Sequence, residues 1–312
     1  MVGNLNHCRV LVTGGTGYLG ARIGKSLAEQ GYEVCLGSRY PFANGTVEGC
    51  SQAATDWDDS EFKFCKGFDL VIHAAGMNAK DCAENPEMAY RFNGLLTEKL
   101  IEKAVSYGCK RFFYLSTVHV YQSPLVGIFD ESSLTLNSHP YATSQCYGEE
   151  ALIKALGSKN IAGAVLRLSN CFGPPVINSN ECWNLVLNEF IKDAFLNRKI
   201  TINGDYLSKR DFLPISEFNR VLLSILDFTE SVPNVINVST GASRTLLDVA
   251  LEVSDTVTEL TGTVIEIVKE NSSETASNLS IENNALQRMG IYPSKDLTLE
   301  IRRMVDYLKL SI

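Results

Sequence analysis

The sequence lacks the features that would place the chain in a membrane, on nucleic acid or around a metal. It contains no run of 18 or more apolar residues, which excludes a bilayer-spanning helix. Acidic residues outnumber basic ones by 36 to 28, and the net charge of −8 argues against nucleic acid and anionic membranes as general partners. The four histidines, His7, His73, His119 and His139, show no metal-ligand spacing, so we expect no metal site.

The nine cysteines include no CxxC pair, and their number is odd. Most of them lie inside apolar runs, as Cys8, Cys35, Cys109 and Cys171 do. This pattern favours buried, reduced thiols over a disulfide framework. The first apolar run begins within ten residues of the N-terminus, which leaves no room for a signal peptide. We therefore expect a cytoplasmic protein.

Strand and helix patterns alternate along the first half of the chain. The strands are short apolar runs without polar alternation, which is typical of strands buried on both faces. We expect strands at 8–13, 32–39, 68–76, 111–117 and 161–169, and helices at 21–31 and 96–108. This alternation predicts a doubly wound parallel sheet with right-handed crossovers.

The pattern changes after residue 175. Helices are expected at 183–196, 245–260 and 297–310. Thr245 and Asp248 have the spacing of a capping box at the start of the second of these helices. The polar stretch 269–280 is expected to be a surface loop.

A glycine-rich turn follows the first strand. The segment 12–20, VTGGTGYLG, places Gly14, Gly17 and Gly20 at GxxGxxG spacing. Glycines in this position allow a tight turn, after which the N-terminus of a helix faces a pyrophosphate. The buried strand before the turn and the helix after it favour a dinucleotide site over a plain strand-to-helix turn.

The second strand ends with LGSR, residues 36–39. Proteins that bind NAD usually have Asp or Glu at this point, where it holds the ribose 2′-hydroxyl. The hydroxyl of Ser38 and the cation of Arg39 suit a 2′-phosphate better. We therefore expect NADP rather than NAD, the alternative being that Arg39 is only a solvated loop residue.

Further segments resemble motifs of the extended short-chain dehydrogenases/reductases, in particular the NAD-dependent epimerase/dehydratase (nucleotide-sugar) family. The matching segments, in family order, are TGGTGYLG (13–20), HAAG (73–76), YRFNGLLTEKLIEKA (90–104), YLSTVHVY (114–121), PYATSQCYGEE (140–150), RLSNCFGP (167–174), RDFLPISEF (210–218) and NVSTG (237–241). The resemblance implies an α/β fold with a Rossmann-type doubly wound parallel sheet in residues 1–170. It also implies a smaller α/β substrate domain in 171–312, from which about 205–240 returns to the Rossmann sheet.

The resemblance also implies a catalytic pair, Tyr141 and Thr117. The family has a Lys four residues after the Tyr, and this chain has Gln145 there. A tyrosine, with a reference pKa of about 10, forms a phenolate at neutral pH only beside a positive charge. Gln145 can hydrogen-bond the nicotinamide ribose, but it carries no charge. We therefore expect slower chemistry rather than lost binding.

The other site residues follow from the same motifs. The expected cofactor contacts are Gly14, Thr16, Gly17, Tyr18, Leu19, Gly20, Ser38, Arg39, Asp56, Trp57, Ala74, Ala75, Gly76, Asn93, Ser116, Tyr141 and Gln145. Asn170 and Arg210 are the expected substrate contacts, with Arg210 near the phosphates.

Two positions depart from the dehydratases of the family. Those enzymes have an Asp-Glu pair directly after the Thr, and here Val118 and His119 take its place, so 4,6-dehydration is not expected. In an alternating strand Thr117 and His119 would point to the same side. His119 is then either an acid/base near the substrate or a structural histidine. The stretch 269–280 also lacks the Arg that clamps the phosphates; Lys269 is its nearest cation.

The implied function is an NAD(P)-dependent oxidoreductase or epimerase that acts on a nucleotide-activated sugar, as a 4-keto reductase or a 4-epimerase. The family implies a homodimer with a four-helix interface that includes the helix at 96–108. One alternative is a catalytically impaired dinucleotide-binding protein that serves as a sensor or partner subunit, which Gln145 favours. Another is a reductase of a non-sugar carbonyl compound.

Overall fold

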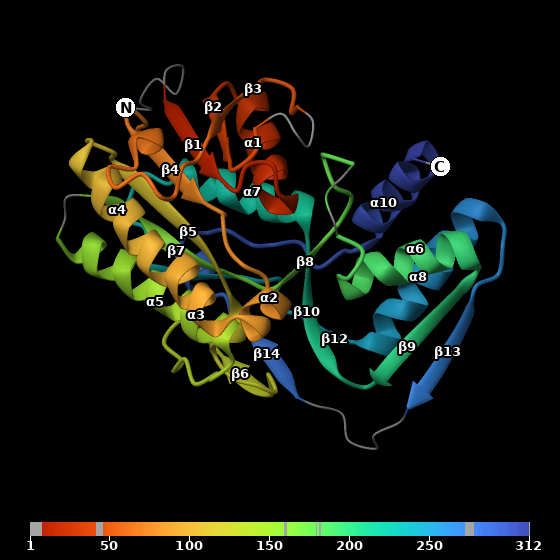
Figure 1. The fold of residues 1–312 in the computed structure, drawn as a ribbon. Coiled ribbons are helices and arrows are strands. Elements are labelled where there is room, and N and C mark those ends of the chain that lie inside the picture. Colours follow the sequence, from red (N-terminus) through yellow and green to blue (C-terminus); the bar gives the residue numbers. More distant parts are fainter. Residues whose placement is uncertain are drawn as a thin grey trace.

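The computed structural model describes residues 8–41, 46–158, 161–178, 180, 182–271 and 278–311. Its largest element is a seven-stranded sheet in the order β11-β7-β5-β4-β1-β2-β3 (Figure 1). The strands are β1 (Arg9–Thr13), β2 (Glu33–Ser38), β3 (Cys50–Ala54), β4 (Leu70–His73), β5 (Arg111–Thr117), β7 (Ala162–Leu168) and β11 (Val235–Val238). All neighbouring pairs are parallel, and the order reverses between β1 and β4. The predicted Rossmann-type sheet is confirmed.

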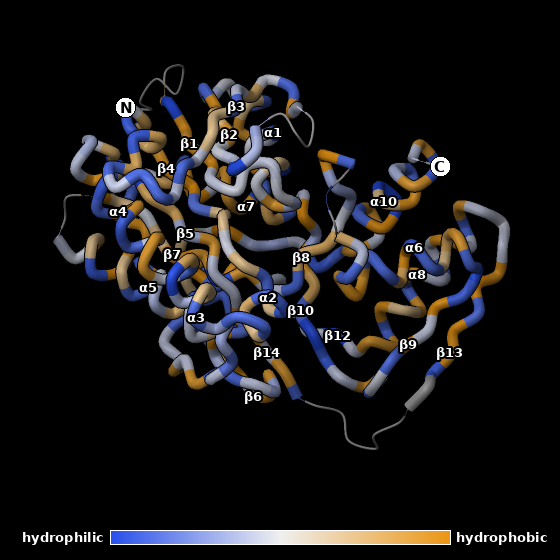
Figure 2. Tube along the Cα trace, viewed as in Figure 1, coloured by the Kyte–Doolittle hydropathy of each residue, from blue (hydrophilic) through white to orange (hydrophobic). Residues whose placement is uncertain are grey.

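Helices cover both faces of this sheet. On one face, α1 (Tyr18–Glu29) and α7 (Ile215–Leu226) share a buried apolar cluster with Val10 and Val12 of β1. On the other face, α4 (Leu96–Ser106) and α5 (Pro140–Gly157) pack on Leu11. The central strands are therefore apolar on both sides, whereas hydrophobic and hydrophilic residues alternate along α4 and α5 (Figure 2).

The C-terminal part forms a second, smaller core. The helices α6 (Val186–Asn197), α8 (Leu246–Thr261) and α10 (Thr298–Ser311) pack together with β9 (Lys199–Asp205), which pairs with β13 (Glu266–Asn271). Thr245 caps α8 through the reciprocal bonds of a capping box with Asp248, which confirms that prediction. The chain returns to the large sheet through α7 and β11, and the division at residue 170 stays a prediction.

Short elements join the two parts. The remaining bounds are α2 (Ala79–Glu84), α3 (Pro86–Ala89), β6 (Gly127–Phe129), β8 (Asn170–Phe172), β10 (Lys209–Pro214), β12 (Ser243–Thr245), β14 (Leu279–Ile281) and α9 (Asn284–Arg288). Strands β8, β10 and β12 form a small sheet between the large sheet and the C-terminal helices (Figure 1).

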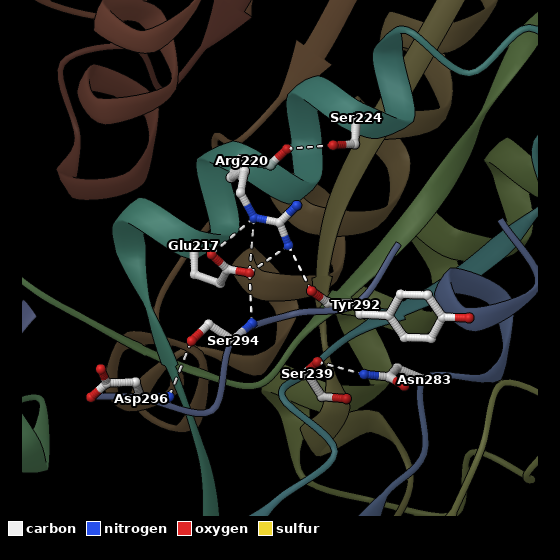
Figure 3. Close-up of polar contacts among 8 residues, drawn as sticks. All are labelled: Glu217, Arg220, Ser224, Ser239, Asn283, Tyr292, Ser294 and Asp296. Atoms are coloured by element: carbon white, nitrogen blue, oxygen red, sulfur yellow. Dashed lines mark hydrogen bonds and ion pairs between the residues drawn. The ribbon is translucent and has the colours of Figure 1, made fainter. Parts of the chain in front are cut away.

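A polar network ties the segment before α10 to α7 (Figure 3). The guanidinium of Arg220 binds the carboxylate of Glu217 through both oxygens and donates to the carbonyl of Tyr292 at 2.8 Å. The backbone N–H of Ser294 donates to Glu217 at 2.7 Å. The path of the chain into α10 is thus attached to the Rossmann part, which limits how far the two parts can separate.

Some predicted boundaries were wrong. The strand expected at 68–76 spans only Leu70–His73, because the backbone from Ala74 to Gly76 leaves the sheet. The helix expected from 183 begins at Val186. The stretch 269–280 is not a loop throughout, since its ends belong to β13 and β14, while 272–277 lie outside the described residues.

Candidate functional site

The glycine turn brings the backbone close to the neighbouring strand end. Gly14 has a φ of +65°, and a Cβ built on it would lie 2.8 Å from the backbone of Ala75. A Cβ on Gly20 would lie 2.2 Å from the carbonyl oxygen of Gly14. Only glycine fits these two positions. Helix α1 then begins at Tyr18, and its N-cap residue, Gly17, has no side chain to cap it, so the first N–H groups of the helix remain available for an anion.

A cavity of about 500 Å³, which we call the glycine cleft, lies over this turn. The predicted cofactor residues that line it are Gly14, Thr16, Gly17, Tyr18, Ser38, Arg39, Trp57, Ala74, Ala75 and Gly76. The lining residues that the sequence analysis missed are Gly37, Tyr40, Thr55, Asn78, Phe92 and Asn180. Thr55 was missed because β3, the strand before it, is too polar to be recognised from its pattern.

Seven of the predicted cofactor residues do not line the glycine cleft, namely Leu19, Gly20, Asp56, Asn93, Ser116, Tyr141 and Gln145. Gly20 packs against Gly14 inside the turn. The exposed Asp56 accepts the backbone N–H groups of Asp58 and Asp59, at 3.0 and 3.2 Å. Asn93 accepts the N–H of Met77 at 2.9 Å and donates to Ser144 at 3.0 Å, so it connects the loop after β4 to α5.

The end of the second strand has a hydroxyl pair and a free cation. The hydroxyls of Thr16 and Ser38 lie 2.9 Å apart, and Ser38 also accepts the N–H of Tyr40 at 3.3 Å. Ser38 is buried, whereas Arg39 and Tyr40 are exposed along the glycine cleft. Arg39 forms no ion pair within the part of the chain that the structure describes.

A second cavity, of about 310 Å³, adjoins the glycine cleft, and Tyr18 lines both. We call it the Tyr141 cavity. The predicted site residues that line it are Tyr18, Leu19, Ser116, Thr117, His119, Tyr141, Asn170 and Arg210. The structure thus brings together side chains that lie nearly 200 positions apart, from α1, β5, α5, β8 and β10.

Tyr141 lies in the first turn of α5. Pro140 starts the helix and the side chain of His139 accepts the Tyr141 N–H, so local sequence holds the tyrosine in place. Burial raises the pKa of Tyr141 to about 12, and a hydrogen bond with the Thr117 side chain opposes this rise. Tyr141 is therefore a neutral phenol, a proton donor, at neutral pH.

Gln145 lies one helical turn after Tyr141 and is only 5% exposed. Its Oε1 accepts the hydroxyl of Tyr114 at 2.5 Å. A Cβ built on Gly76 would lie 3.6 Å from its Nε2, so the amide nitrogen faces the loop that lines the glycine cleft. Burial raises the pKa of Tyr114 well above its usual value, which keeps it protonated as the donor. Gln145 therefore offers a donor, without charge, toward the cleft.

A buried ion pair lies beside Ser116. The Ser116 hydroxyl donates to Glu149 at 2.5 Å, and the guanidinium of Arg167 binds the same carboxylate through Nε and Nη2. All three side chains are buried. Because Arg167 neutralises Glu149, the pair positions Ser116 at the cavity wall without adding net charge there.

Arg210 reaches the Tyr141 cavity from β10. It forms no ion pair among the described residues, and burial lowers its pKa. The neighbouring carboxylate of Asp211 is buried and accepts hydrogen bonds from Ser169 and Thr240 instead. The N-terminus of α6 also meets this cavity and has no side-chain cap. With no carboxylate in its described lining, the cavity suits an anion.

The expectation that strand alternation would place His119 on the same side as Thr117 was wrong. Strand β5 ends at Thr117, and His119 lies in a short 3₁₀ helix, Val118–Val120, where side chains do not alternate. His119 nevertheless lines the Tyr141 cavity. The residue is exposed, so neighbouring protein atoms cover it only in part.

The described residues were also searched for membrane-spanning helices, metal sites and disulfides. None of the helices there is long and apolar enough to cross a membrane. A search of the same residues finds no group of His, Cys, Asp or Glu side chains that could hold a metal ion. All nine cysteines are unpaired.

Named proteins similar to the chain are nucleotide-sugar enzymes. A putative UDP-glucose 4-epimerase of Methanocaldococcus jannaschii is 26% identical over 308 residues, which cover 96% of this chain and 98% of that protein. The dTDP-6-deoxy-L-talose 4-dehydrogenase (NAD(P)(+)) of Kitasatospora kifunensis is 29% identical over 264 residues, or 81% of each chain.

Solved structures share the fold. The UDP-N-acetylglucosamine 4-epimerase of Methanobrevibacter ruminantium, in complex with UDP-N-acetylmuramic acid, has a TM-score of 0.84 at 22% identity, covering 98% of this chain and 100% of that one. MoeE5, in complex with UDP-glucuronic acid and NAD, has a TM-score of 0.80 at 21% identity, covering 97% and 100%.

The model of the NAD dependent epimerase/dehydratase family matches residues 10–239. This range contains the glycine turn, the Tyr141 cavity and the return of the chain to the large sheet. The chain therefore belongs to the NAD-dependent epimerase/dehydratase family, a family of enzymes that act on nucleotide-activated sugars.

Proposed function

We propose that this protein transfers hydride at a carbonyl or hydroxyl carbon of a nucleotide-activated sugar, as a 4-keto reductase or a 4-epimerase. The observation that carries the proposal is the lining of the Tyr141 cavity, which combines Tyr141 and Thr117 with Arg210. Tyr18 lines both this cavity and the glycine cleft, so a sugar in the first would lie beside a dinucleotide in the second.

The nucleotide diphosphate is the part of the substrate that the charges favour. Arg210 is a half-buried cation without an ion-pair partner among the described residues, and the uncapped start of α6 adds backbone N–H groups. A diphosphate would satisfy both at once. Asn170 is less available to it, because its Nδ2 already donates to the carbonyl of Asp211 at 2.9 Å.

The protonation state of Tyr141 favours reduction. A phenol with a pKa of about 12 can donate its proton to a carbonyl oxygen at neutral pH, whereas the phenolate needed for oxidation is scarce. The bound dinucleotide supplies or accepts the hydride. Thr117 hydrogen-bonds Tyr141 and accepts the N–H of His119 at 3.2 Å, which holds its hydroxyl at the reaction site.

The residues around the glycine cleft fit a dinucleotide. The turn at Gly14 and Gly17 would hold the pyrophosphate, and Gln145 Nε2 would donate to the nicotinamide ribose. Arg39 faces the position of the adenine ribose with no carboxylate beside it in the described lining, which supports NADP over NAD.

Cofactor identification is the first experiment. The purified protein is denatured, any released dinucleotide is identified by mass spectrometry, and NADPH and NADH are titrated into cofactor-free protein. NADPH should bind more tightly, and Arg39→Ala should weaken NADPH binding about tenfold while leaving NADH nearly unchanged. Tightly retained NAD, or equal effects on both, would contradict the proposed preference.

Turnover is then measured with UDP-glucose for epimerisation and with dTDP-4-keto-6-deoxyglucose and NADPH for reduction. Tyr141→Phe should lower the rate at least about 100-fold without changing NADPH binding, because it removes the proton donor. An unchanged rate in Tyr141→Phe would contradict the proposed mechanism.

One observation favours a second candidate, a catalytically impaired member that binds dinucleotide as a sensor or partner subunit. Gln145 replaces the family's cation, and the described lining of the Tyr141 cavity offers only Arg210 as a permanent positive charge. Dinucleotide binding without turnover of any nucleotide-sugar probe would favour this candidate.

A further inference from the structure

The Tyr141 cavity contains a second group able to carry a proton. We propose that His119 is a catalytic acid/base that accepts the proton of the sugar hydroxyl during oxidation, and that Asn170 is its positioning residue. The inference deepens the proposed function and rests on it.

The backbone of His119 is fixed on both sides. Its N–H donates to the hydroxyl of Thr117 at 3.2 Å, and its carbonyl accepts the Nδ2 of Asn137 at 2.6 Å. Because β5 gives way to a 3₁₀ turn at this point, the imidazole lines the same cavity as Tyr141 and Thr117. A sugar in contact with this pair would also meet His119.

Asn170 is the polar partner of the His119 side chain. Its Nδ2 donates to the carbonyl of Asp211 at 2.9 Å, and its side chain also hydrogen-bonds His119. This second bond favours the protonated imidazole, as expected when the ring N–H donates to the Asn170 Oδ1. One ring nitrogen is then held as the donor to Asn170, and the other keeps its lone pair for the substrate.

The surroundings keep the free imidazole neutral. The other titratable side chains that line the cavity are Tyr18 of α1, Tyr141 of α5, Cys171 of β8 and Arg210 of β10. Burial lowers the pKa of His119, and the charge of Arg210 lowers it further, while the bond to Asn170 opposes both. At neutral pH His119 can therefore accept a proton, which the phenol of Tyr141 cannot.

Substrate binding would strengthen this role. A diphosphate beside Arg210 offsets the charge that disfavours the imidazolium, so the pKa of His119 rises once the substrate is bound. In the oxidation step the hydroxyl O–H bond breaks and its proton moves to the free ring nitrogen of His119. The adjacent C–H bond would break with its electron pair, which an oxidised dinucleotide held in the glycine cleft would accept as hydride, while the C=O bond forms and Tyr141 donates a hydrogen bond to that oxygen.

The test compares wild type, His119→Asn and Asn170→Ala in the oxidation of UDP-glucose and dTDP-glucose across pH. The wild-type rate should fall as pH drops through the pKa of His119, because the protonated ring cannot accept a proton. His119→Asn should be at least about 100-fold slower near neutral pH and should lose this pH dependence. Asn170→Ala should shift the pH at which the rate falls, because it removes the partner of the His119 side chain. If Asn170 had only a structural role, this pH would stay the same.

Two controls separate chemistry from folding. NADPH affinity and the thermal melting temperature should be the same in His119→Asn as in wild type. Added imidazole should restore part of the rate of His119→Gly, since it can occupy the vacated place and accept the proton.

The outcomes distinguish this inference from the proposed function. If wild type is active and His119→Asn has the same rate and the same pH profile, the proposed role of His119 is wrong. The proposed function is not affected by that result. A wild type that transfers no hydride with any probe would overturn the proposed function, and this inference with it.

Discussion

At the scale of single residues, Gln145 stands where the family resemblance leads us to expect a lysine, and it offers hydrogen bonds without a charge. The Tyr114 hydroxyl occupies Gln145 Oε1 at 2.5 Å, which turns Nε2 toward the glycine cleft. A hydrogen bond to a ribose needs no charge, whereas formation of a phenolate at Tyr141 does. We therefore expect Gln145 to support ribose binding in this chain without promoting proton transfer by Tyr141.

Gln145→Lys should speed the oxidation of a sugar hydroxyl at neutral pH. The added cation would lower the pKa of Tyr141 from about 12. A drop of two pKa units corresponds to about 2.7 kcal/mol, or roughly 100-fold more phenolate at neutral pH. The measurement is the initial rate of dinucleotide reduction with UDP-glucose, and Gln145→Met, which is uncharged, is the matched control. Equal rates in wild type and Gln145→Lys would mean that charge at this position does not limit the reaction.

At the scale of elements, helix starts follow local rules that need no tertiary contacts. The Thr245 hydroxyl accepts the Asp248 N–H at 3.0 Å, and the Asp248 carboxylate accepts the Thr245 N–H at 3.1 Å. Both residues lie within one turn at the start of α8. The cap stabilises the helix that carries much of the C-terminal core.

Thr245→Ala should lower the free energy of unfolding of the C-terminal part by about 1 kcal/mol, because it removes the cap acceptor. Urea unfolding, followed by circular dichroism, measures the shift of the transition midpoint. Thr245→Ser keeps the hydroxyl and should stay close to wild type. A Ser variant as unstable as the Ala variant would point to the lost methyl group rather than the cap.

At the scale of the whole molecule, exposed apolar side chains gather on α5 and on the helical segment 90–95 that precedes α4. Leu95 is 46% exposed and Tyr147 is 49% exposed, and the Tyr147 ring lies 4.5 Å from that of Tyr90. A hollow of about 280 Å³ lies among these side chains. We propose that a second copy of the chain covers this surface and forms a homodimer.

Leu95→Glu combined with Tyr147→Glu should convert the dimer to a monomer, because a dimer would have to bury four added charges. Size-exclusion chromatography with light scattering measures the mass. Val264→Glu, at a residue that is 82% exposed, is a control that should leave the mass unchanged. A wild-type protein that elutes as a monomer would refute the proposed interface.

Features set by neighbouring residues could be predicted from the sequence. The glycine turn at 12–20, the buried strands and the capping box of α8 depend on backbone sterics, on hydrophobic pattern and on hydrogen bonds within one turn. The family resemblance added the expectation that these strands form a Rossmann-type parallel sheet. Strand β3 escaped prediction because it lies at the sheet edge, where partial exposure allows the polar sequence CSQAA.

Only the tertiary structure decided which side chains share a cavity and what state they are in. Tyr114 meets Gln145, and Asn170 meets His119, across separations of 31 and 51 positions that no local pattern specifies. Burial raises the pKa of Tyr141, whereas burial and the charge of Arg210 lower the pKa of His119. These effects depend on distances in the folded structure rather than on separation along the sequence. The sequence by itself determined the elements and the residue types of the site, while packing determined the proton donor, the proton acceptor and the free cation.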